Sequence, residues 1–145
     1  MGQRVAAETV IDAAPDQIYA VIADLEAYPD WADDVVRTEV VERGEDGLPH
    51  LVAFEVDARI ALVHYVLQYQ HDPPHRVRWR LVEGEMLSQL DGSYRLAPGP
   101  DGTTTVRYAL EADLAMPLPS FIQRRAARVI LETGLAGLRE RVEGR

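Results

Sequence analysis

The stretch PLPSFIQRRAARVILETGLAGLRERV, residues 117–142, decides the fold that the sequence predicts. Its prolines introduce an unbroken helical spacing of apolar residues, which predicts one long helix over about 119–142. Such a helix is about 36 Å long, and a ten-residue strand is about 33 Å long. One helix can therefore lie along a whole sheet. Its apolar face is expected to carry Ile122, Ala126, Val129, Ile130 and Thr133, widened by Leu131, Leu135, Leu138 and Val142.

The chain ahead of this helix mostly alternates between apolar and polar residues, which is the period of a strand. The predicted strands cover residues 3–11, 35–41, 51–57, 60–70, 76–82, 88–96 and 103–114. Turn-forming sequences such as GEDG, HDPPH, VEGE and APGPDG join the later strands, which indicates an antiparallel meander. After the first strand, Pro15 and Asp16 suit the start of a short helix that buries Ile18, and Pro29 is expected to end it.

Strand alternation sorts the side chains onto two faces of the predicted sheet. The face expected to meet the long helix is apolar and rich in aromatic residues: Thr38, Val40, Phe54, Val56, Tyr65, Leu67, Tyr69, Val77, Trp79, Leu81, Leu90, Tyr94, Val106, Tyr108 and Leu110. The opposite face is charged, as contact with water requires: Arg37, Glu39, Glu55, Arg78, Arg80, Arg95, Arg107, Glu111 and Asp113. As a set, the inner residues suit a ligand pocket, although for any one of them a plain core is the simpler interpretation.

Composition and charge exclude several classes of function. The 145 residues fit one domain, 1–145, and the absence of cysteine excludes disulfides, thiolate metal sites and a cysteine nucleophile. All 15 basic residues are arginine, and the net charge of −9 opposes binding to nucleic acid. No apolar run approaches the roughly 20 residues that cross a bilayer, and the start MGQRVAAETV lacks the pattern of a signal peptide. We therefore expect a cytoplasmic protein without stable membrane insertion.

Five stretches, in this order and spacing, resemble the bacterial polyketide cyclase/dehydrase and coenzyme-Q-binding group of the START-like (SRPBCC) superfamily. They are APDQIYAVIADLEAYPDW (14–31), VRWRLVEG (77–84), DGSYRL (91–96), DGTTTVRY (101–108) and PLPSFI (117–122). The resemblance implies an α+β helix-grip fold, in which a curved antiparallel sheet of about seven strands wraps the C-terminal helix and two short helices follow the first strand. It also implies a cavity between sheet and helix for an apolar or aromatic molecule, which some members cyclise and others carry.

The resemblance places the YPDW turn, residues 28–31, against one end of the long helix, near the cavity entrance. Tyr28 and Trp31 therefore either gate the pocket or, as large aromatic residues often do, cap the core. The complete candidate ligand-binding set is Tyr28, Trp31, Thr38, Phe54, Val56, Tyr65, Leu67, Tyr69, Trp79, Tyr94, Tyr108, Ile122, Ala126, Val129 and Ile130. No catalytic residue, metal ligand or cofactor is assigned.

Other features have plainer interpretations. The histidines match no metal-ligand spacing and are expected at the surface or in turns: His50, His64, His71 and His75. Two glycines inside the long helix, Gly134 and Gly137, indicate close packing of helix on sheet or, alternatively, room for a ligand. A basic patch on the same helix is expected to be solvated, or to attract an acidic headgroup or ligand carboxylate: Arg124, Arg125 and Arg128.

The sequence favours a non-enzymatic protein that binds or transports a hydrophobic small molecule such as a lipid, an isoprenoid quinone or a polyketide-like compound. Its predicted interior offers almost no ionisable group, which general acid–base catalysis requires. The alternative is a polyketide aromatase/cyclase that directs ring closure largely through pocket shape. A third hypothesis, a ribosome-associating module, is opposed by the acidic charge. The expected partner is the hydrophobic molecule itself, and the expected state is a monomer or weak homodimer.

Overall fold

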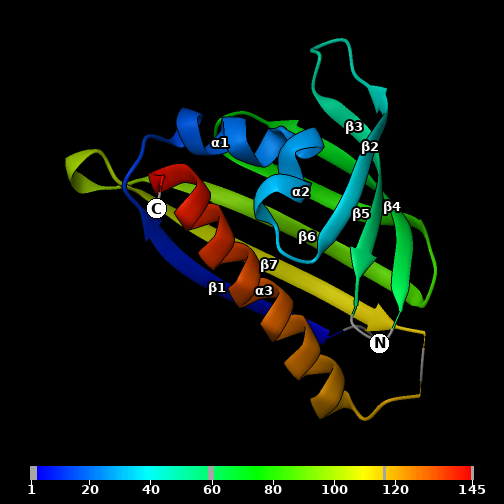
Figure 1. The fold of residues 1–145 in the computed structure, drawn as a ribbon. Helices are drawn as coiled ribbons and strands as arrows, with labels where there is room; N and C mark the ends of the chain where they lie inside the picture. Colours follow the sequence, from blue (N-terminus) through cyan, green and yellow to red (C-terminus); the bar gives the residue numbers. More distant parts are fainter. Residues whose placement is uncertain (1–2, 59–60, 116, 145) are drawn as a thin grey trace.

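The computed structural model describes residues 3–58, 61–115 and 117–144. The fold is built around one antiparallel sheet (Figure 1). Its strands are β1 (Gln3–Ile11), β2 (Val35–Arg43), β3 (Pro49–Asp57), β4 (Leu62–Asp72), β5 (Arg76–Gly84), β6 (Leu87–Pro98) and β7 (Thr104–Leu114). The helices are α1 (Pro15–Ala23), α2 (Tyr28–Trp31) and α3 (Ser120–Glu143), with the short 3-10 helices η1 (Leu25–Ala27) and η2 (Pro100–Gly102). No helix in these ranges is both long enough and apolar enough to span a membrane.

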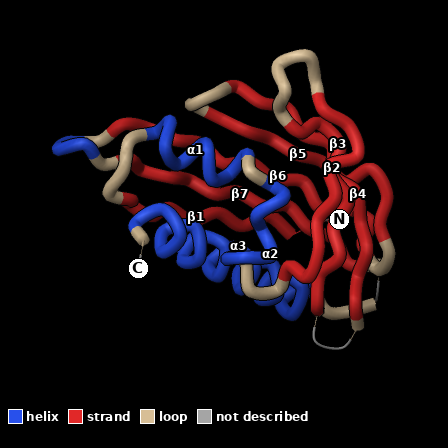
Figure 2. The backbone as a smooth tube through the Cα atoms, turned by 45° about the horizontal axis from the view of Figure 1, so that its top comes forward, coloured by secondary structure: helices blue, strands red, loops and turns tan. Residues whose placement is uncertain are grey.

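The strands lie in the order β1-β7-β6-β5-β4-β3-β2, so strands β2 to β7 form a continuous antiparallel meander. β1 closes the sheet against β7, with Gln3 facing Ala112 and Ile11 facing Thr104. α3 lies over β1 and β7, and α1 and α2 lie on the same side of the sheet (Figures 1 and 2). The predicted class is confirmed: seven strands curve around a long C-terminal helix, and two short helices follow the first strand.

The inner face of the sheet is buried and its outer face is exposed to solvent, as the alternation of apolar and polar residues predicts. Val52, Val77 and Val106 are fully buried on the inner face. Their neighbours on the outer phase, such as Arg78 and Arg107, are exposed. Apolar side chains therefore point from five adjacent strands into the space in front of α3.

Two predicted boundaries change in the structure. α1 ends at Ala23, and Pro29 lies in the first turn of α2 instead of ending the preceding helix. Proline is compatible with a first helical turn because the N–H groups there have no acceptor within the helix, so the N–H that proline lacks costs no hydrogen bond. The predicted strand over 60–70 is β4, which begins at Leu62, and Ile60 lies outside the described residues.

The predicted apolar face of the long helix is only partly correct. The buried residues of α3 are Ala127, Leu131, Leu135 and Leu138. The predicted burial is wrong for four positions that are exposed: Ile122, Val129, Ile130 and Thr133. The physical reason is that the helix packs on β1 and β7 through one narrow stripe, and these four residues lie outside that stripe at 3.6 residues per turn.

Candidate functional site

A wall of aromatic rings covers the inner face of the sheet, in two groups of rings that are in contact. The rings come from β3 to β7, and neighbouring pairs have centroids 4.5–5.8 Å apart, within the usual range for aromatic contacts. The contacts join Phe54 to Tyr65, Tyr69 to Trp79, Trp79 to Tyr94, and Tyr94 to Tyr108. Six predicted site residues are thus brought together on one surface.

Four tyrosine hydroxyls of this wall have no hydrogen-bond partner among the described residues: Tyr65, Tyr69, Tyr94 and Tyr108. In the same part of the chain, the buried side-chain atoms that lack a partner are Trp31 Nε1 and Gln123 Oε1. The tyrosine oxygens are not among them, so each borders a space that admits water. A wall of apolar rings that presents a few unpaired hydroxyls is typical of a small-molecule pocket.

These phenols stay protonated at neutral pH. Burial, helped by nearby tyrosines, raises the pKa of Tyr69 and of Tyr94 well above the usual value of 10.0. Burial also raises the pKa of Tyr65 and of Tyr108. The charged form is disfavoured because an apolar surrounding cannot solvate it. The four groups can therefore donate a hydrogen bond to a ligand, and they cannot act as bases.

The helix meets this wall at its two glycines. A Cβ atom at Gly134 would lie 3.0 Å from Tyr108 Cε2 and 3.8 Å from the Tyr94 hydroxyl. A Cβ atom at Gly137 would lie 3.5 Å from the Trp31 ring. Gly134 thus allows close packing of helix on sheet, and a larger side chain there would push against the Tyr108 ring and reach toward the Tyr94 hydroxyl. At Gly137 the distance is an ordinary van der Waals contact.

One side of α3 passes from contact with the aromatic wall to exposure in solvent. Ala126 and Ile130 lie two turns and one turn before Gly134 on the same side of the helix, because residues four apart are neighbours on a helix surface. Gly134 faces the aromatic wall, whereas Ile130 is 49% exposed. On the sheet side, Val56 and Tyr65 are half-buried. The side of α3 that meets the wall at Gly134 is therefore open to solvent one turn earlier.

The structure gives a different role to one predicted polar group and a definite place to the YPDW turn. The Thr38 hydroxyl donates to the Leu25 carbonyl at 2.6 Å, so it holds η1 on the sheet. The Tyr28 hydroxyl donates to the Ile22 carbonyl at 2.7 Å. The Trp31 ring lies 4.9 Å from that of Tyr28 and packs against Gly137. The turn thus sits on α3, as the resemblance implies, and its gating role stays a prediction.

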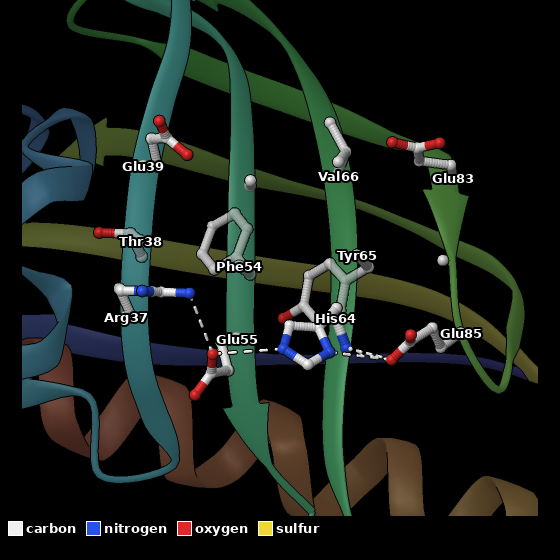
Figure 3. Close-up of a pocket in the computed structure, with 12 residues that line it drawn as sticks. Arg37, Thr38, Glu39, Phe54, Glu55, His64, Tyr65, Val66, Glu83 and Glu85 are labelled. Carbon is white, nitrogen blue, oxygen red and sulfur yellow. Dashed lines mark hydrogen bonds and ion pairs between the residues drawn. The ribbon is translucent and has the colours of Figure 1, made fainter.

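A pocket of about 400 Å³ lies on the outer face of β2 to β5 (Figure 3). His64 is its centre: Nδ1 lies 2.9 Å from a Glu85 oxygen, and Nε2 lies 3.2 Å from Glu55. Arg37 adds a further ion pair to Glu55 at 3.3 Å. The predicted surface position of His64 is confirmed. Its cluster could have been found by noticing that outward phases on adjacent strands carry opposite charges.

His71 contradicts the surface position predicted for it, because it is half-buried on the inner side. Its Nε2 lies 2.7 Å from the Pro49 carbonyl, which can only accept, so Nε2 carries the proton. Nδ1 then accepts from the Tyr19 hydroxyl, also at 2.7 Å. Burial lowers the pKa of His71, and burial raises the pKa of Tyr19 to about 12. The pair ties α1 to the end of β4.

The two histidines are expected to titrate on opposite sides of the ordinary pKa of 6.5. Hydrogen bonds to Glu85 and Glu55 raise the pKa of His64, so its stabilising effect is present below pH 6.5 and is lost as the pH rises through the raised value. The His64 contacts lower the pKa of Glu85, whose effect is lost as the pH falls below 4.5. Imidazole NMR shifts would measure both histidines. Glu85→Gln should bring His64 back toward 6.5, and a His64 midpoint at or below 6.5 in the wild type would contradict the geometry.

Comparison with known proteins agrees with this architecture. The family model described as polyketide cyclase/dehydrase and lipid transport matches residues 2–143. The chain belongs to this family. No curated protein matches its sequence significantly.

Solved structures share the fold of this family member. A START superfamily protein from Mycobacterium smegmatis is 20% identical with a TM-score of 0.93, and 99% of each chain is covered. An aromatase/cyclase from a Streptomyces species is 16% identical with a TM-score of 0.83, covering 99% of this chain and 94% of that one. A protein from Thermus thermophilus is 25% identical with a TM-score of 0.82, covering 97% of both chains.

Proposed function

We propose that this family member binds a hydrophobic small molecule, such as a lipid, an isoprenoid quinone or a polyketide-like compound, between the aromatic wall and α3. One observation carries the proposal: four protonated tyrosine hydroxyls without a partner among the described residues face a space that admits water, in a wall that is otherwise apolar. A hydrophobic molecule with one or two oxygen atoms would fill the space and satisfy these donors.

Binding without chemistry is favoured by the ionisable groups that face inward. Among the described inner positions these are the tyrosines, His71 and His50. Both ring nitrogens of His71 are already hydrogen-bonded, and His50 stacks on His71 with its Nε2 3.6 Å from Asp46. General acid–base catalysis works best with a group whose pKa lies near the working pH, and the raised pKa values of Tyr69 and Tyr94 lie far above it. Binding and carrying a ligand therefore requires no group that these residues do not supply.

The second candidate is a polyketide aromatase/cyclase, the activity named for the Streptomyces relative in fold. The observation that favours it is the row of hydroxyls, which could hold the carbonyl oxygens of a reactive chain in a folded shape. Orientation of this kind can lower a barrier substantially without an acid or a base. In that case Tyr65, Tyr69, Tyr94 and Tyr108 would be the donors.

The test is a thermal-shift panel of fatty acids, isoprenoid quinones and polycyclic aromatic compounds with delipidated protein. At a hundredfold excess over its dissociation constant, a ligand stabilises by about 2.7 kcal/mol, or roughly 5–10 °C for this size of domain. Gly134→Leu should remove the shift, because the new side chain would displace the Tyr108 ring and occupy the side of the proposed pocket near the Tyr94 hydroxyl. Ala136→Leu, on the exposed side of α3, is the matched control and should keep it.

The same panel, followed by tryptophan emission, tests the gate. The chain has two tryptophans, so Trp31→Phe leaves the signal of Trp79 alone. A ligand that perturbs Trp31 at the entrance should lose part of its effect in this variant. If no compound moved either the melting temperature or the emission, the proposed binding would be refuted; if the emission change survived Trp31→Phe intact, only the gate would be.

A further inference from the structure

The first half of α3 is exposed and apolar. Phe121 is 73% exposed, Ile122 40%, Val129 56% and Ile130 49%. These are four of the ten large hydrophobic side chains that are exposed in the described residues, and all four lie in the first half of one helix. Scattered exposed apolar residues are ordinary, but a cluster on one element marks a contact surface.

The same half of the helix is basic. Residues 117–131 contain Arg124, Arg125 and Arg128 and no acidic residue, in a chain of net charge −9. In the described part of the chain none of the three guanidinium groups forms an ion pair, and Arg124 Nε makes one long hydrogen bond, 3.4 Å, to Gln3. This surface therefore has positive charge available for an anionic partner.

Helix geometry sets the apolar and basic groups side by side. At 3.6 residues per turn, Ile122 and Val129 point away from the buried stripe of Ala127 and Leu131. Arg125 lies on one flank of this apolar ridge. Long arginine side chains can lie along apolar material and still reach a charged surface with their ends.

The second half of α3 has the opposite character. Its outward positions include Glu132, Ala136 and Glu140, which are exposed. An anionic surface would attract the first half of the helix and repel the second. Ile130 is 49% exposed and lies one turn before Gly134, which meets the aromatic wall, so the attracted half of the helix lies next to the proposed pocket.

We propose that the first half of α3, residues 120–130, docks this protein on an anionic lipid bilayer, with Phe121, Ile122 and Val129 in the headgroup region and the arginines on the acidic headgroups. A partly inserted amphipathic helix with arginines beside its apolar face binds such surfaces. The docked orientation points the pocket entrance at the lipid, and in this respect the inference rests on the proposed function. The size and exposure of the four apolar side chains favour a bilayer over an acidic protein.

The experiment is flotation of delipidated protein with vesicles of phosphatidylcholine alone and of phosphatidylcholine mixed with phosphatidylglycerol. The protein should bind the mixed vesicles and bind the neutral ones only weakly. Each arginine near an anionic surface changes affinity roughly fivefold, so Arg124→Gln, Arg125→Gln and Arg128→Gln together should lower it about a hundredfold. Raising the salt concentration should weaken wild-type binding in the same direction.

Matched variants separate the surface from general changes in charge or hydrophobicity. Phe121→Ser with Val129→Ser should lower binding to both kinds of vesicle. Val10→Ser with Val41→Ser removes comparably exposed valines on β1 and β2 and should leave binding unchanged. Arg95→Gln with Arg141→Gln is the control for the triple arginine variant.

The outcomes are distinguishable from those of the pocket test. Gly134→Leu should bind mixed vesicles like the wild type even where it shows no thermal shift with any compound. Wild-type protein that does not float with mixed vesicles, or control variants that lose as much affinity as the α3 variants, would overturn the docking proposal. Neither result would bear on ligand binding in the interior.

Discussion

A chain that ends at Pro119 is expected to lose cooperative folding altogether. Leu131, Leu135 and Leu138 are at most 5% exposed against the sheet, and burying three such side chains contributes about 5–9 kcal/mol. That amount is comparable to the whole stability of a typical domain, about 5–15 kcal/mol. Removing α3 also exposes the aromatic wall, so the product should be insoluble or behave as a molten globule.

The measurement is thermal and urea unfolding followed by circular dichroism, together with binding of a hydrophobic dye. A chain that ends at Glu143, which keeps all of α3, is the control and should unfold in one sharp transition. If the shorter chain showed a sharp transition too, the sheet would be stable without its helix, and α3 would not belong to one cooperative unit with it.

Trp79→Ala is expected to lower the free energy of unfolding by about 3–5 kcal/mol, the usual cost of removing a large buried aromatic side chain. The Trp79 ring is 9% exposed, lies 5.4 Å from that of Tyr94 and 5.8 Å from those of Tyr69 and Tyr108, and covers Gly92 so closely that no Cβ atom would fit there. The cavity left by the substitution is therefore bordered by rigid rings.

Arg78→Ala is the matched control one position away. Arg78 is exposed and donates to Gln70 at 2.9 Å, so its loss should cost well under 1 kcal/mol. Urea unfolding of both variants measures the difference. Reversed costs would contradict the assignment of faces on β5. A mild effect of Trp79→Ala combined with lost ligand binding would instead make Trp79 a wall of an open pocket.

The sheet could be predicted from the sequence because the alternation of apolar and polar residues along each strand shows which side chains share a face. Trp79 and Arg78 are neighbours in the chain, yet the first is buried and the second exposed, as a period of two requires. The same rule placed the rings of five strands on one wall. Turn sequences rich in glycine and proline then left little freedom in how consecutive strands pair.

The face of α3 could not be chosen from periodicity alone. Its first half is apolar on two sides, so Ile130 and Leu131 both fit a buried stripe by spacing, and only Leu131 meets the sheet. The predicted surface position of His71 was wrong for a different reason. Its place beside the HDPPH turn suggests the surface, whereas its burial depends on Tyr19, 52 positions away in the sequence. Contacts between distant segments leave no local pattern.

The candidate site was predictable in its wall and not in its hydrogen bonds. The tyrosines follow from alternation, but the single hydrogen bond that occupies the Thr38 hydroxyl depends on where η1 lies. The place of the YPDW turn likewise depends on how far α2 reaches along α3, which the contact of Trp31 with Gly137 fixes.

The pairing of β1 with β7 has a consequence for how the chain folds during its synthesis on the ribosome. Arg4 and Glu111 bond across these strands although they are 107 positions apart. At the pace of translation, about 5–20 residues per second, β1 waits roughly 5–20 s before its partner has been made. The meander of β2 to β6 can assemble meanwhile from neighbouring hairpins, which close quickly. The first strand of the chain is thus among the last to pair, and the inner face of the sheet is covered only when synthesis has passed α3.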